Sequence, residues 1–325
     1  MPESLYKRII EQGTLDEPKG KPNPVFALPS TRNWMRALAI SSNEITWQIA
    51  KSNYVKVQRR TMSPQNENTV LEQLFLSLHH LSALSKMKSD SDIVDFSRIS
   101  VVAWYYGISN AARAMIAAQQ GSCPEDHSGT ARVWDEIIAS KNLSIFPFNL
   151  RVDTLVEKEF KQQITALRNG CPADLLKEPI SDKEALGALT SYLSGTADWY
   201  SWLAKERVKV KPEFRELGVE NFRSKAAQKI RDTFLGSKSV GFLHEAHRYR
   251  GKANYREALF LAYGQLPAKV LVGFQSDLQK VLGAFLTMSG ALCSQRLGKS
   301  TWNEFISDIE TNKAFTMSAK NILIK

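Results

Sequence analysis

The sequence predicts a mainly α-helical protein, and three observations support this prediction. Apolar residues recur at three- and four-residue spacing over long stretches, which is the period of one helix face. Signals that start and end helices flank these stretches, among them Pro212 at a first turn and Gly236 just past a last turn. Strand-like alternation is rare. The expected fold is therefore a helical bundle with an extended or part-β N-terminal region.

The expected elements follow in order along the chain. Residues 1–30 contain five prolines and few periodic apolar residues, so they are expected to form an extended arm. Residues 31–60 fit neither period cleanly, and strands are most expected in this N-terminal region. After a polar break at 61–68, Thr69 and Glu72 form a capping box that opens the first strong helix. Further helices are expected at 93–120, 131–140, 152–169, 182–209, 212–235, 239–250, 255–263, 268–297 and 300–311.

Composition excludes several classes of protein. Among 325 residues, the three cysteines lie far apart, with no CxxC and none at ligand spacing from a histidine. A disulfide scaffold and a local zinc motif are thereby excluded, and neither a metal nor a cofactor is expected. The most apolar stretch, 99–118, contains Arg113, which would be costly in lipid. We therefore expect a cytoplasmic protein in which this stretch is a buried helix and no segment enters a membrane.

Charge is concentrated in one part of the chain. The net charge is +10, and residues 205–257 hold 14 Lys and Arg against 7 Asp and Glu, which is +7 of the total. A basic balance of this kind attracts phosphate backbones, acidic proteins or anionic surfaces without choosing among them. RNA or DNA is therefore an expected partner of the segment 205–257, and a solvated helix face is the alternative.

The late part of this segment interleaves cations with tyrosines. Cations can pair with phosphates while aromatic rings stack on bases, which is how single strands are commonly held. The structural alternative is that Asn254 caps a helix, with Glu257 three residues later, and that Gly251 ends the helix before it. The expected nucleic-acid-binding residues are Arg248, Tyr249, Arg250, Lys252, Tyr255 and Arg256.

A second candidate lies on the apolar helix 93–120. Tyr106, Asn110 and Arg113 fall on one helix face, surrounded by apolar residues. Because an arginine cannot lose its charge in a dry site, this face is either a satisfied interior polar cluster or the wall of a ligand cleft. His127 follows in a loop and could act as an acid, a base or a phosphate donor, or simply cap a helix. His127 and Arg113 are therefore the catalytic candidates.

Other catalytic motifs are absent from the sequence. No P-loop, dinucleotide-binding fingerprint, HExxH motif or nucleophile elbow occurs. The sequence thus points to no nucleotide-hydrolysing, dehydrogenase, zinc-protease or serine-hydrolase chemistry.

The two candidate segments together resemble the HEPN superfamily. The stretch AWYYGISNAARAM at 103–115, followed by HSG at 127–129, is similar to the superfamily's YYxxxxAARAL and HxG pattern. The stretch RYRGKANYR at 248–256 is similar to its RxxADY segment, with Asn254 where Asp is usual. The resemblance implies that an N-terminal region, 1–68, precedes a helical domain, 69–325. The core of this domain would be 69–140 and 239–310, with a helical insertion at 141–238.

The resemblance also implies a function. HEPN domains often dimerise and occur in toxin–antitoxin, CRISPR and phage-defence systems, and the active ones are similar in an Arg-x(4–6)-His motif. None of the five histidines here has an arginine at that spacing. The expected function is therefore a non-catalytic subunit of a bacterial defence-type assembly that binds nucleic acid, a protein partner or a second copy of itself. Two alternatives stay open: a metal-independent ribonuclease in which folding brings His127 to Arg113 or to Arg248 and Arg250, and a purely structural adaptor.

Overall fold

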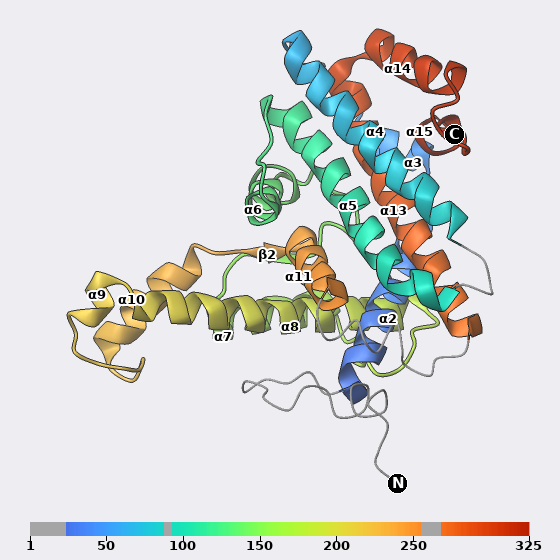
Figure 1. The fold of residues 1–325 in the computed structure, drawn as a ribbon. Helices are drawn as coiled ribbons and strands as arrows, with labels where there is room; N and C mark the ends of the chain where they lie inside the picture. The colour runs from blue at the N-terminus through green and yellow to red at the C-terminus, as the bar shows by residue number, and fades with distance from the viewer. Residues whose placement is uncertain (1–23, 88–92, 255–267, 325) are drawn as a thin grey trace.

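The computed structural model describes residues 24–87, 93–254 and 268–324, and it confirms the mainly helical fold (Figure 1). The α-helices are α2 (Pro24–Ser41), α3 (Trp47–Asn53), α4 (Pro64–Lys86), α5 (Ile93–Gln120), α6 (His127–Ile137), α7 (Glu157–Arg168), α8 (Asp182–Lys209), α9 (Pro212–Arg215), α10 (Lys225–Gly236), α11 (Phe242–Asn254), α13 (Ala268–Leu297), α14 (Lys299–Thr311) and α15 (Lys320–Leu323). A short 3₁₀ helix, Ala139–Lys141, follows α6. Strands β1 (Arg151–Val152) and β2 (Val240–Gly241) pair antiparallel, with Arg151 opposite Gly241.

The N-terminal region differs from expectation. Helices α2 and α3 occupy residues 24–41 and 47–53, so the expectation of strands there is wrong for the described residues. The ambiguous apolar pattern arises because α2 is buried on several sides, with Trp34, Met35 and Leu38 at most 1% exposed. Residues 1–23 of the expected arm lie outside the described residues.

Helix ends were less predictable than helices. Helix α4 begins at Pro64, and the Ser63 side chain accepts from the Asn66 amide, so the capping box expected at Thr69 is wrong. The helix expected at 212–235 is interrupted, since α9 ends at Arg215 and α10 begins at Lys225. Gly251 does not end a helix, because α11 continues to Asn254. The helix expected at 255–263 lies outside the described residues.

Three long helices form the centre of the molecule. Helices α4, α5 and α13 pack against one another in a bundle, and α8 crosses below it, as Figure 1 shows. Helix α2 contacts both α8 and α13, and α11 lies between α8 and the pair formed by α5 and α6. No helix among the described residues is long and apolar enough to cross a membrane.

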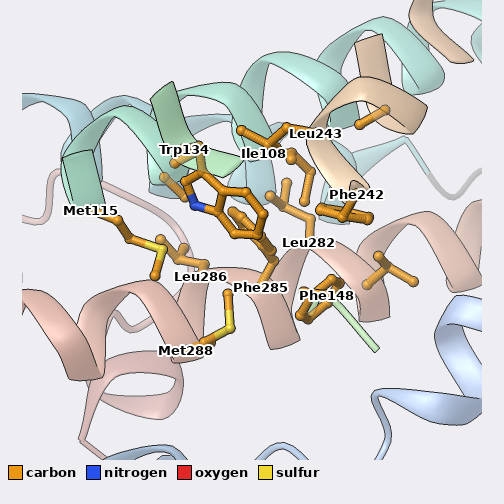
Figure 2. Packing of buried hydrophobic residues seen from close by; sticks show 14 of the residues in the cluster. Ile108, Met115, Trp134, Phe148, Phe242, Leu243, Leu282, Phe285, Leu286 and Met288 are labelled. Atoms are coloured by element: carbon orange, nitrogen blue, oxygen red, sulfur yellow. The ribbon is translucent and has the colours of Figure 1, made fainter. Parts of the chain in front are cut away.

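The main core joins elements that are far apart in the sequence. Figure 2 shows Trp134 of α6 near Phe285 of α13, with Phe242 of α11 and Phe148 packed alongside. The ring centroids of Phe148 lie 4.8 Å from Phe242 and 4.9 Å from Phe285. Because all four side chains are at most 1% exposed, this cluster fixes α6, α11 and α13 relative to one another.

A polar contact also ties α6 to α11. The buried Asp135 on α6 accepts from Arg151 Nε at 3.1 Å and Nη2 at 2.8 Å, and from Ser239 Oγ at 2.5 Å. Arg151 and Ser239 belong to the β1–β2 ribbon and its approach, and β2 runs directly into α11. A bidentate pair of this kind holds its partners in one geometry. The start of α11 is thereby held beside α6.

Candidate functional site

The structure brings the two candidate segments together. Helix α11, which carries the late basic cluster, packs on α5 and α6. His127 is the first residue of α6, where Asp126 caps the helix by accepting from the Gly129 amide at 2.7 Å. The side chains around His127 belong to α5 and α11. The predicted proximity of the tyrosine-rich helix and the arginine–tyrosine stretch is confirmed for the described part of that stretch; Tyr255 and Arg256 lie outside it.

Two imidazoles and two phenols meet at this junction. The rings of His127 and His247 are stacked, with centroids 6.0 Å apart and planes at 27°. The Tyr105 ring lies 5.2 Å from His127 and 6.1 Å from His247, and the Tyr106 ring lies 5.5 Å from His127. The phenol rings therefore form one wall against the imidazole pair.

Two guanidinium groups, those of Arg113 and Arg250, lie near enough to His127 to lower its pKa. The Arg250 guanidinium carbon lies 5.1 Å from the Tyr105 ring centroid, one helical turn after His247. Arg113, which is one of the catalytic candidates expected from the sequence, lies on α5. The Nε atoms of Arg113 and Arg250 are buried and have no hydrogen-bond partner, and neither side chain forms an ion pair with another described residue. We call His127, His247, Arg113 and Arg250 the His–Arg cluster.

The electrostatics of the cluster favour neutral imidazoles and a negatively charged guest. Burial lowers the pKa of His127, and Arg250 and Arg113 lower it further, while Asp126 opposes them. Burial, Arg250 and His127 bring the pKa of His247 to about 4. Burial also raises the pKa of Tyr105, which therefore stays a neutral phenol. The two guanidiniums are half-buried, and neither pairs with a carboxylate among the described residues, so the charge that they add to the site is positive.

Such an arrangement can bind an oxyanion and move protons beside it. Guanidinium groups match the geometry of phosphate and carboxylate oxygens, and the interaction strengthens where water is partly excluded. Neutral imidazole can accept a proton, and imidazolium can donate one. The cluster therefore offers an anion site with two adjacent proton carriers.

Other residues expected in the site lie elsewhere. Arg248 points to α8, where it donates to Thr196 Oγ1 at 3.2 Å and lies over the rings of Tyr192 and Trp199. Tyr249 is fully buried and donates to the Thr31 carbonyl at 2.9 Å, so it cannot stack on a base. Asn110 is 8% exposed on α5. Lys252 lies on α11, and its side chain is outside the described part of the structure.

Two residues of the site were not singled out from the sequence. His247 lies in the basic cluster, and Tyr105 precedes the expected Tyr106. Helical spacing could have predicted the role of His247. His247 and Arg250 are three residues apart, and this spacing places both on one face of α11. Arg248 and Tyr249 fall on other faces, toward α8 and the core.

In the described ranges, no group of three or more His, Cys, Asp or Glu side chains is arranged to hold a metal ion. Comparison with protein-family models, with curated proteins and with solved structures finds no match to this chain.

Proposed function

We propose that this protein is a metal-independent endoribonuclease whose active site is the His–Arg cluster. The observation that carries the proposal is the stacked His127–His247 pair beside two guanidiniums that pair with no carboxylate among the described residues. The similarity of the α5 and α11 sequences to HEPN domains supports the same assignment. It also supports a role in a defence-type assembly or a homodimer. The superfamily's Arg-x(4–6)-His motif is absent from this sequence, and we propose that residues from α5, α6 and α11 take its place.

The reaction that suits these groups is transfer of the RNA backbone to its own 2′-hydroxyl. One imidazole accepts the 2′-hydroxyl proton while the 2′-oxygen attacks phosphorus and the bond from phosphorus to the 5′-oxygen breaks. The other imidazole, protonated, donates to the leaving 5′-oxygen. Arg113 and Arg250 stabilise the charge on the non-bridging oxygens. The products are a 2′,3′-cyclic phosphate and a 5′-hydroxyl, and each histidine ends in the other's protonation state.

A second candidate function, RNA binding without cleavage, is favoured by a specific observation. The low pKa of His247, about 4, and the lowered pKa of His127 leave neither imidazole protonated at neutral pH in the free protein. A bound phosphodiester would raise both pKa values, because negative charge stabilises imidazolium. If the rise in pKa leaves one imidazole protonated, that imidazole can donate to the leaving oxygen and the protein is a nuclease. If it does not, the protein binds RNA without cutting it.

Cleavage of RNA in the presence of EDTA tests the proposal. The wild-type protein should cut a single-stranded RNA to products with 2′,3′-cyclic phosphate ends, while an oligonucleotide with a 2′-deoxy residue at the cut site should stay intact. His127→Ala and His247→Ala should each reduce the rate by about 10²–10⁴-fold, the usual loss on removing a general acid or base. The exposed His79 of α4 provides the control, since His79→Ala should cut at the wild-type rate.

Binding without cleavage would leave the non-catalytic module as the function. In that case RNA would bind to the wild-type protein, and the affinity would fall in Arg113→Gln and Arg250→Gln. If RNA is neither cut nor bound, the nuclease proposal and the binding module are both wrong.

A further inference from the structure

A cavity of about 490 Å³ lies between α6 and the C-terminal half of α8. It is closed at its ends by the residues that lead into β2 and by the start of α11. Its size falls within the range of pockets that hold small organic ligands. The proposed function does not use it.

The cavity adjoins the His–Arg cluster. Asp126 and Ser128, the neighbours of His127 along the chain, line the cavity, and His244 does so one helical turn before His247. His244 is close enough to His247 to be among the groups that lower the pKa of His247. A chain bound in the cluster can therefore continue into the cavity.

The cavity lining is cationic and aromatic. Arg132, Arg207 and Lys238 contribute three positive charges, and none of them forms an ion pair with another described residue. Asp126 and Glu136 also line the cavity, but the Asp126 carboxylate is already engaged as the cap of α6. The excess of charge in the cavity is therefore positive.

Two rings accompany these cations. The Tyr200 ring meets the His244 ring edge to face, with centroids 5.4 Å apart. The ammonium group of Lys238 lies 5.2 Å from the centroid of the Phe234 ring. Aromatic side chains beside cations are the combination that holds an unpaired nucleotide, because the base stacks while its phosphate is paired.

We propose that the cavity is the subsite for the nucleotide next to the scissile phosphate. Its base packs against Tyr200, and its outer phosphate is held by Arg132, Arg207 and Lys238. The substrate is then single-stranded RNA, because a base inside a duplex must leave its stack to enter such a cavity. This inference rests on the proposed function, because that function places the scissile phosphate in the His–Arg cluster. The RNA binding that it predicts can still be measured without cleavage.

The test is binding of a fully 2′-O-methylated RNA hexanucleotide, which cannot be cleaved, followed by fluorescence anisotropy. Tyr200→Leu should weaken binding about tenfold, whereas Tyr200→Phe, which keeps the ring, should bind like the wild type. Arg207→Gln should weaken binding and reduce the slope of log K against log salt by about 0.7, the value for one phosphate contact on a single strand. Lys183→Gln, which removes an exposed cation of α8 that lies outside both the cavity and the segment 205–257, should change neither. A duplex of the same sequence should bind more weakly than the single strand.

The outcomes separate this inference from the proposed function. If the wild type fails to cut RNA but the Tyr200 and Arg207 variants bind as predicted, the subsite stands and the nuclease proposal fails. If RNA is cut but Tyr200→Leu and Arg207→Gln keep the wild-type Kd and KM, the subsite is overturned. Equal affinity for duplex and single strand would also overturn it.

Discussion

At the scale of single residues, Glu245 is a carboxyl group in unfavourable surroundings. It lies on α11, is 4% exposed, and its buried Oε1 atom has no hydrogen-bond partner among the described residues. Burial raises its pKa well above the ordinary value, and the nearby Arg248 only partly opposes this. The native protein therefore holds a proton on Glu245 that the unfolded chain releases near pH 4.5.

Replacing this carboxyl should change how stability depends on pH. Because the folded pKa is raised, Glu245 stabilises fully below its unfolded pKa, and that contribution is lost as pH rises through the folded pKa. Glu245→Gln should therefore become more stable relative to the wild type as pH rises from 5 to 7, by up to about 1.4 kcal/mol for each pH unit over which only the folded wild type keeps the proton. Urea unfolding at both pH values measures the difference.

The comparison between the two proteins cancels the other groups that titrate in this range. His127, His244 and His247 have lowered pKa values, so they contribute in the opposite direction, and they do so equally in both proteins. Parallel pH profiles for Glu245→Gln and the wild type would contradict the prediction.

At the scale of elements, the packing of α8 depends on one close approach. A Cβ atom placed on Gly187 would lie 1.7 Å from the carbonyl oxygen of Pro172. A backbone oxygen cannot swing aside as a side chain can, so the segment that precedes α8 would have to move. Helix α8 carries Tyr192 against Trp34, with ring centroids 4.4 Å apart, and Tyr200 against His244. Helix α8 thus contributes side chains both to the core and to the lining of the cavity.

Gly187→Ala should therefore destabilise the protein by about 2 kcal/mol or more, the range for side chains forced into a packed interior. Gly195 lies on the same helix with nothing within 4 Å of an added Cβ. Gly195→Ala should be neutral or stabilise by up to about 1 kcal/mol, because alanine favours the helix. Denaturant unfolding of the two variants gives the comparison; equal effects would show that the approach of Pro172 does not constrain α8.

At the scale of the whole molecule, the net charge of +10 should attract an anion to the proposed site, and binding there should be coupled to proton uptake. The pKa of His247 is about 4 in the free protein, and that of His127 is lowered. A phosphodiester between Arg113 and Arg250 would raise both. The complex then binds more protons than the free protein over the interval between the free and bound pKa values, so affinity must rise as pH falls.

The affinity for the 2′-O-methylated hexanucleotide should accordingly increase by up to about tenfold per pH unit for each proton taken up as pH is lowered from 7 to 5. The double variant His127→Ala/His247→Ala should lose most of this dependence while His244, which lines the adjacent cavity, retains a small part. Anisotropy titrations at constant salt measure both. A wild-type affinity that is flat over this interval would show that no phosphate reaches the imidazoles.

Much of the fold could be predicted from local pattern. The long helices α5, α8 and α13 match the expected ranges 93–120, 182–209 and 268–297, because each keeps one apolar period over many turns. Helix α2 and the start of α4 could not be placed in this way. The apolar residues of α2 are buried on several sides, which removes the period, and the cap of α4 is a single serine six residues before the capping box that the pattern suggested.

For the candidate site, too, the sequence predicted some features and not others. Arg113 could be found because an arginine in apolar surroundings needs a partner or a cleft. His127 could be found because an imidazole titrates near neutral pH, and Arg250 because it lies among tyrosines in the basic cluster. Their partnership could not be found in this way, since it joins α5, α6 and α11. Tyr249 and Arg250 are adjacent in the chain, yet one is buried under Thr31 and the other lies over Tyr105.

The sequence by itself determined the helical class, the main helices and a pool of cationic and aromatic residues, because helical period and residue chemistry act over a few neighbouring positions. Only the tertiary structure decided which of these residues share a site. Side chains on a helix point in directions 100° apart, and the face that meets a neighbour depends on how three distant helices bury their aromatic residues together. His127 and His247 lie far apart in the sequence. They meet because Trp134, Phe242 and Phe285 pack in one core.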